Sequence, residues 1–297
     1  MPGWSEIQNE ILAFENPYDV VRRKYLKSLS GYTGRNTITY YSGWLQKEGF
    51  PGKDPYVFFV NDTDKNGFMS VIHDLDPELG LDLVLHTPGG DIAATESLVE
   101  YLHSKFSDIR AIIPQMAMSA GTMIALSCRE IIMGRQSSIG PIDPQYDGVS
   151  AHGVVEESKR ASDDIKNDPL MIGIWEPILS QYSPAFIGDC RKAIDWANVM
   201  VKDWLIKGMF DGLPNAELLA DKVLAELSDH ALTLSHSRHI SAVRAKTLGI
   251  KVMLMEDDQF LQDHILSLHH ACVLTLSDTM VFKLVENQNG SSFISSF

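Results

Sequence analysis

A serine and a pair of glycines within one segment have the residue types and the spacing needed for acyl-transfer chemistry. Gly89 and Gly90 follow a short apolar run, and Ser119 lies 30 residues after Gly89 at the start of a very apolar stretch. A serine nucleophile needs a proton acceptor, and the oxyanion that it generates needs preplaced hydrogen-bond donors. Glycine can take unusual backbone angles and bring its N–H group close to a ligand. The segment therefore indicates a serine hydrolase site, with the glycine N–H groups as candidate oxyanion donors.

The hydrophobic pattern around these residues predicts alternating strands and helices. Short apolar runs predict strands at 81–85, 109–113 and 130–133, and a helix is predicted over 92–105. Strands separated by helical patterns of this length form a parallel sheet with right-handed crossovers. Ser119 opens a second, very apolar helix and would sit at its positive N-terminal end. Each turn thus follows a predicted strand and precedes a helix.

The chain divides into three regions by its pattern. Residues 1–54 are mixed and polar, and we expect a helical N-terminal arm that packs on the core or on a partner subunit. Residues 55–183 carry the α/β core, and residues 184–297 are expected to form a mainly helical C-terminal region packed on that core. Within the last region, a short apolar stretch at 251–255 could return as a strand.

Net charge and the distribution of apolar residues indicate which binding partners and which cellular compartment to expect. The formal net charge is −14, which disfavours a nucleic-acid partner, and we expect none. The N-terminus lacks the pattern of a secretory signal, and no stretch reaches the roughly 18 apolar residues of a membrane span. We therefore expect a cytoplasmic protein without a membrane span. The cysteines, Cys128, Cys190 and Cys272, are widely spaced and are expected to be buried thiols.

Several separated motifs resemble one protein family. They are NTITYYSGWLQK, LHTPGGDIAATESLVEYL, PQMAMSAGTMIALS and SSIGPIDPQ, and the likeness extends roughly from Thr37 to His270. These motifs resemble the serine dehydrogenase proteinases, which are relatives of signal peptide peptidase A within the Clp protease and crotonase superfold. The resemblance implies an α/β fold with a parallel-sheet core. It also implies that Ser119 is the nucleophile and that the N–H groups of Gly90 and Ala120 form the oxyanion hole.

The same resemblance implies an activity. We expect a cofactor-free serine endopeptidase that hydrolyses a peptide or an unfolded protein segment through an acyl-enzyme on Ser119. Relatives of this fold assemble into multimers that enclose their sites, so a homo-oligomer is also expected.

The identity of the general base is left open by the sequence. A Clp-type site would have a histidine downstream of the serine, but SSIGPIDP at 137–144 contains none. Relatives of signal peptide peptidase A use a downstream lysine, and a desolvated lysine with a lowered pKa can act as a base. Lys159 and Lys166 lie on a helix predicted over 154–167, with Lys159 slightly favoured. Acidic neighbours on that helix are equally typical of a face exposed to water.

Histidines offer a further base and a weak metal hypothesis. His152 lies in a loop after SSIGPIDPQ, and its ordinary pKa near 6.5 suits proton transfer. Asp143 could orient a base or line the pocket, although an aspartate flanked by proline is usually a turn residue. His236 and His239 are expected to pair with carboxylates at 256–258. No spacing matches a zinc motif, so no metal is expected.

Two other functions use the same features. A crotonase-like acyl-CoA hydratase or hydrolase would use the two N–H donors for a thioester enolate and would make Ser119 incidental. A catalytically inactive assembly or binding protein would keep the fold without a base.

Overall fold

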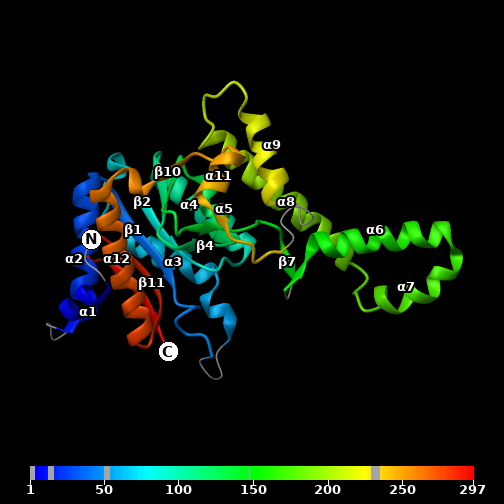
Figure 1. Ribbon diagram of the computed structural model, residues 1–297, viewed down its shortest axis with the longest axis horizontal. Coiled ribbons are helices and arrows are strands. Elements are labelled where there is room, and N and C mark those ends of the chain that lie inside the picture. Colours follow the sequence, from blue (N-terminus) through cyan, green and yellow to red (C-terminus); the bar gives the residue numbers. More distant parts are fainter. Residues whose placement is uncertain (1–3, 13–16, 50–53, 147, 229–234) are drawn as a thin grey trace.

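A mostly parallel sheet forms the centre of the molecule (Figure 1). The computed structural model describes all residues except 1–3, 13–16, 50–53, 147 and 229–234. Within these residues the sheet has seven strands in the order β10-β5-β3-β2-β1-β11-β12. The first five are parallel to one another, and β11 pairs antiparallel with both β1 and β12. The strands are β1 (Asn36–Ser42), β2 (Leu81–His86), β3 (Ile109–Ile113), β5 (Glu130–Met133), β10 (Val252–Leu254), β11 (Val281–Asn287) and β12 (Ser292–Ser296).

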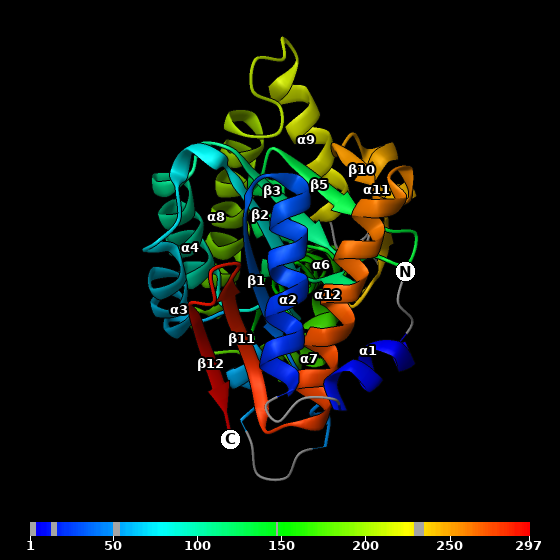
Figure 2. The ribbon, with the colours of Figure 1, turned by 90° about the vertical axis from the view of Figure 1, so that its left-hand side faces the viewer.

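Helices cover both faces of this sheet (Figure 2). Helices α2 and α12 lie on one face, whereas α3, α4 and α5 lie on the other. The described helices are α1 (Trp4–Leu12), α2 (Pro17–Thr33), α3 (Asp62–Ile72), α4 (Ile92–Lys105), α5 (Ala120–Ser127), α6 (Ala151–Asn167), α7 (Ile172–Leu179), α8 (Phe186–Lys207), α9 (Ala216–Leu227), α11 (Ala242–Leu248) and α12 (Gln259–Asp278). None of them is long and apolar enough to cross a bilayer.

The sheet has two hydrophobic cores because alternate side chains of a strand point to opposite faces. On β2, Leu83 and Leu85 join the core beneath α3, α4 and α5, whereas Val84 joins the core beneath α2 and α12. Burial of both faces explains why β3, β5 and β10 are mostly apolar runs. The three cysteines are buried and free, as expected from their apolar surroundings.

A second, small sheet beside the first one contains the segment just before Ser119 and two segments that follow it in sequence. Its strands β4 (Met116–Ala117), β6 (Ser138–Ile139) and β9 (Ile240–Ser241) lie in the order β4-β6-β9. β4 is also joined to the end of β2 through an isolated bridge between Thr87 and Ala117. The small sheet therefore connects the glycine turn to chain segments more than a hundred residues away.

A helical arm projects from the body of the molecule (Figure 1). It starts at the short hairpin of β7 (Gln145–Tyr146) and β8 (Val149–Ser150), continues through α6 and α7, and returns along α8. The Ser150 side chain caps α6 by accepting the N–H of Gly153, so the helix begins before the predicted start at Val154.

The α/β fold with a parallel core is confirmed, and the predicted helix over 92–105 and strands at 109–113 and 130–133 match α4, β3 and β5. The division of the chain into three regions differs from the observed packing. β1 lies inside the expected N-terminal arm, yet it pairs with β2 at the centre of the sheet. β11 and β12 belong to the expected helical C-terminal region and complete the same sheet. Their pairing depends on contacts between the two ends of the chain, which local patterns do not encode.

Candidate active site

Ser119 lies at the turn between β4 and α5 in a strained backbone conformation. Its φ of 49° is the only positive φ of any non-glycine residue within the described chain. Such conformations cost about 1–3 kcal/mol and cluster at functional sites. Ser119 occupies the N-cap position of α5, but its side chain makes no capping hydrogen bond. The hydroxyl is therefore not used for helix capping.

The glycine turn lies directly against Ser119. A Cβ atom on Gly89 would lie 2.6 Å from the Cβ of Ser119, and the φ of Gly89 is 104°. A Cβ atom on Gly90 would lie 2.3 Å from the backbone N and O of Val60. Both positions thus require glycine, one for its backbone angle and both for close approach.

The pairing with Val60 sets the direction of the Gly90 backbone. Val60 donates its N–H to the Gly89 carbonyl at 2.8 Å and accepts the N–H of Asp91 at 2.9 Å. In such a parallel bridge the N–H of the intervening residue points away from the partner strand. The N–H of Gly90 therefore points away from Val60.

Two backbone N–H groups remain available beside Ser119. Among the hydrogen bonds formed between described residues, none uses the N–H of Gly90 or of Ala120 as donor. Ala120 is the first residue of α5, where the N–H has no partner within the helix and the helix dipole is positive. These two groups have the chemistry of an oxyanion hole.

A histidine and a buried aspartate form a hydrogen-bonded pair on the other side of the site. His236 Nδ1 lies 2.6 Å from Asp143 Oδ1, and the Asp143 side chain is fully buried. The small sheet brings together the two chain segments that carry this pair. Ile139 of β6 lies opposite Ile240 of β9, and Asp143 lies four residues after Ile139, whereas His236 lies four residues before Ile240.

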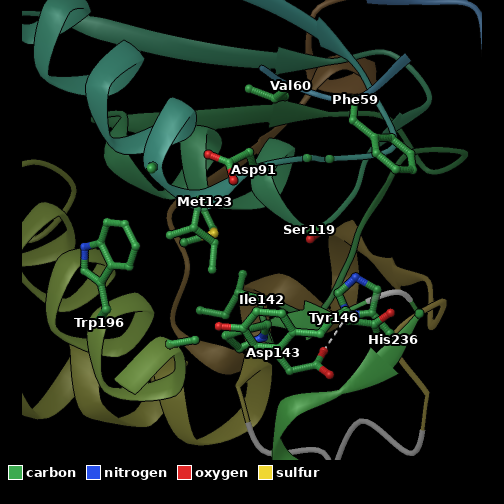
Figure 3. Close-up of a pocket in the computed structure, with 18 of the residues that line it drawn as sticks. Phe59, Val60, Asp91, Ser119, Met123, Ile142, Asp143, Tyr146, Trp196 and His236 are labelled. Atoms are coloured by element: carbon green, nitrogen blue, oxygen red, sulfur yellow. Dashed lines mark hydrogen bonds and ion pairs between the residues drawn. The ribbon is translucent and has the colours of Figure 1, made fainter. Parts of the chain in front are cut away.

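Ser119 and His236 face one cavity (Figure 3). The cavity has a volume of about 940 Å³, which is within the range of pockets that hold drug-sized ligands or peptide side chains. Met123, Ile142 and Trp196 give it an apolar end. Gly89, Gly90 and Asp143 also contribute to its wall.

Sequence comparison assigns the chain to a family. The family profile of the ClpP-like SDH-type serine proteinases matches residues 18–253. The chain belongs to this family. The resemblance recognised from the motifs is therefore confirmed.

The individual relatives add little about function. Two uncharacterized proteins of Methanocaldococcus jannaschii are similar to this chain, MJ1495 at 27% identity over 67% of the chain and MJ0137 at 30% identity over 52%. The chain spans 60% and 53% of the lengths of these relatives. Among solved structures, a mutant form of the 1510-N membrane-bound stomatin-specific protease matches with a TM-score of 0.41 and 16% identity, over 69% of this chain and 79% of that one.

The residues predicted as general base do not line this cavity. Lys159 and Lys166 are exposed on α6, within the projecting arm, and Lys166 lies 3.7 Å from Asp163. His152 lines a separate surface hollow with residues of α8 and α9, and its Nε2 lies 3.4 Å from Ser228 Oγ. The structure brings neither lysine nor His152 to Ser119 within this chain.

His236 is the site residue that sequence reasoning missed. Its expected pairing with carboxylates at 256–258 is wrong, because its described carboxylate partner is Asp143. The contact joins residues 93 positions apart through two-residue strands, which have no recognisable sequence pattern. The described residues contain no group of three or more side chains suited to bind a metal ion.

Proposed function

We propose that this proteinase is a serine endopeptidase in which Ser119 is the nucleophile, His236 the general base and Asp143 the residue that orients His236. The observation that carries the proposal is that Ser119 and the His236–Asp143 pair face one cavity. The N–H groups of Gly90 and Ala120 are proposed as the oxyanion hole. A peptide or an unfolded protein segment is the proposed substrate.

The roles follow from the chemistry of each group. The Asp143 carboxylate accepts a hydrogen bond from Nδ1–H of His236, which leaves Nε2 as the proton acceptor. His236 would take the proton of the Ser119 hydroxyl as it attacks the peptide carbonyl, and would return that proton to the leaving amine. The carbonyl oxygen becomes an oxyanion and accepts hydrogen bonds from Gly90 and Ala120. A water molecule would then attack the acyl-enzyme, with His236 taking its proton and returning it to the Ser119 oxygen as the ester bond breaks.

Labelling with a fluorophosphonate tests the nucleophile and the base together. We expect stoichiometric labelling of the intact protein, no labelling of Ser119→Ala, and a loss of about 10³-fold or more in labelling rate and in casein hydrolysis for His236→Gln. The matched control is the double variant Lys159→Ala/Lys166→Ala, which should stay within about twofold of the intact protein because both residues belong to α6 and neither lines the cavity.

The opposite result has a definite meaning. Loss of activity in the double lysine variant with full activity in His236→Gln would restore the Ser-Lys proposal. An intact protein that does not react would favour the inactive binding protein. Reaction of an acyl-CoA substrate without covalent labelling of Ser119 would favour the acyl-CoA hydratase.

The cellular location and the oligomeric state of the protein are also proposals. Cytoplasmic location and homo-oligomeric assembly rest on the family resemblance and on the sequence pattern. Cell fractionation would test the first, and light scattering after gel filtration would test the second.

A further inference from the structure

A buried ion pair contacts the Phe59–Asn61 segment, which pairs with the glycine turn. Lys283 Nζ on β11 lies 2.9 Å from Asp64 Oδ1 on α3, and the two side chains are 4% and 2% exposed. Neither residue lines the cavity. Lys283 also lies beyond residues 18–253, the part of the chain that matches the family profile.

Both partners bind the backbone on either side of Val60. Lys283 Nζ donates a hydrogen bond to the Phe59 carbonyl at 2.9 Å. The other carboxylate oxygen of Asp64 accepts the N–H of Asn61 at 3.0 Å and the hydroxyl of Tyr40 at 2.8 Å. The pair therefore fixes the residues immediately before and after Val60.

Val60 is hydrogen-bonded to the glycine turn on the side opposite to the Gly90 N–H. Its N–H and carbonyl bond to Gly89 and Asp91, which is why the N–H of Gly90 points away from it. The Lys283–Asp64 pair is thus hydrogen-bonded to the backbone of Phe59 and Asn61, and Val60 between them is hydrogen-bonded to Gly89 and Asp91, the two chain neighbours of the proposed oxyanion donor.

Helix capping alone does not account for this arrangement. Asp64 completes a capping box with Asn61 at the start of α3, but a capping box needs no buried lysine. Burying two charges costs several kcal/mol per ion, so a buried ion pair is weak evidence of a gain in stability. Positioning of the Phe59–Asn61 segment explains why a buried lysine is present, whereas a gain in stability does not.

We propose that Lys283 and Asp64 are positioning residues for the oxyanion hole, holding the Gly89–Gly90 turn at the distance from Ser119 that the reaction requires. This inference rests on the proposed function. A shift of about 1 Å in a catalytic group can cost about 100-fold in rate, so a small displacement of the turn would be measurable.

The test compares two variants that each remove a buried cation paired with an acid. Lys283→Met removes the proposed positioning contact. Arg22→Met is the matched control, since Arg22 is fully buried and bonds Glu286 of the same strand at 2.6 Å, but makes no described contact with residues 58–61. Fluorophosphonate labelling of Ser119 is measured at several probe concentrations, well below both melting temperatures.

The expected result separates reactivity from binding. Lys283→Met should lower the maximal labelling rate by about 10- to 100-fold while the half-saturating probe concentration changes by less than about twofold. Arg22→Met should leave both values within about twofold. If Lys283→Met does not fold, Asp64→Asn is measured against the same criteria.

Two outcomes would overturn the inference alone, and a third would overturn the proposed function as well. Unchanged labelling of Lys283→Met, or equal losses in both variants, contradicts positioning while leaving the serine peptidase proposal intact. Failure of the unmodified protein to react would remove the proposed function and this inference with it.

Discussion

At the scale of the residue, the backbone strain at Ser119 predicts a conflict between stability and activity. A φ of 49° is unfavourable for any residue with a Cβ atom and is accessible to glycine. Ser119→Ala keeps this strain, whereas Ser119→Gly relieves it at the cost of extra freedom in the unfolded chain. Both variants lose the hydroxyl. We therefore expect two inactive proteins of different stability.

Chemical denaturation measures that difference. Ser119→Gly should have a free energy of unfolding about 1 kcal/mol higher than Ser119→Ala, and neither should react with a fluorophosphonate. The alanine variant is the matched control, because both substitutions remove the same hydroxyl. Equal stability of the two variants would show that Ser119 is not strained.

At the scale of the element, the contact between the glycine turn and the Phe59–Asn61 segment predicts a strict size limit at Gly90. A methyl group there would lie 2.3 Å from the Val60 backbone, so the turn or the segment must move. Loss of one oxyanion donor typically costs about 10²–10³ in turnover. We expect Gly90→Ala to lower kcat within that range with a smaller effect on KM.

Gly31→Ala is the control for this substitution. Gly31 lies in α2, and a Cβ atom there would meet no atom within 4 Å. The variant should keep its activity and gain up to about 1 kcal/mol in stability, because alanine favours helix more than glycine does. Casein hydrolysis and denaturation curves of both variants give the comparison. Wild-type kcat in Gly90→Ala would exclude the Gly90 N–H from the oxyanion hole.

At the scale of the whole molecule, buried histidines predict a loss of stability in acid. His86 ends β2 and is fully buried against the rings of Trp44 and Tyr41 at 4.5 and 5.3 Å between centroids. Burial lowers the pKa of His86 to about 3. Burial, with the charges of His86 and His270, also holds the pKa of His269 well below its ordinary value.

The direction of the effect follows from proton binding. The unfolded chain protonates His86 near pH 6.5, whereas the folded protein does so only near pH 3, so the unfolded state binds more protons between these values. The contribution is fully present above about pH 6.5 and is lost as the pH falls. Within this window His86 alone should lower the free energy of unfolding by up to about 1.4 kcal/mol per pH unit.

His86→Phe removes this titration and keeps an aromatic ring among its neighbours. The free energy of unfolding of wild type and variant should diverge between pH 6.5 and pH 5, with wild type losing more stability. Denaturant unfolding at several pH values measures both curves. Parallel curves would show that His86 is protonated equally in the folded and unfolded states.

The sequence by itself determined the part of this protein that is local along the chain. Within residues 81–133, apolar runs, a glycine turn and a serine before an apolar helix predicted β2, α4, β3, β5 and the start of α5 after Ser119. These features depend on neighbours only a few residues away, so periodicity and backbone preference suffice to predict them.

Only the tertiary structure decided which histidine faces the same cavity as Ser119 and which strands complete the sheet. His236 meets Asp143 beside the short pairing of β6 with β9, and β11 pairs with β1 although more than 230 residues separate them. Strands of two residues are too short to show a hydrophobic pattern in the sequence. The lysines expected as bases lie on α6, in the projecting arm. Such contacts are set by the packing of distant segments, whose energy no local stretch of sequence contains.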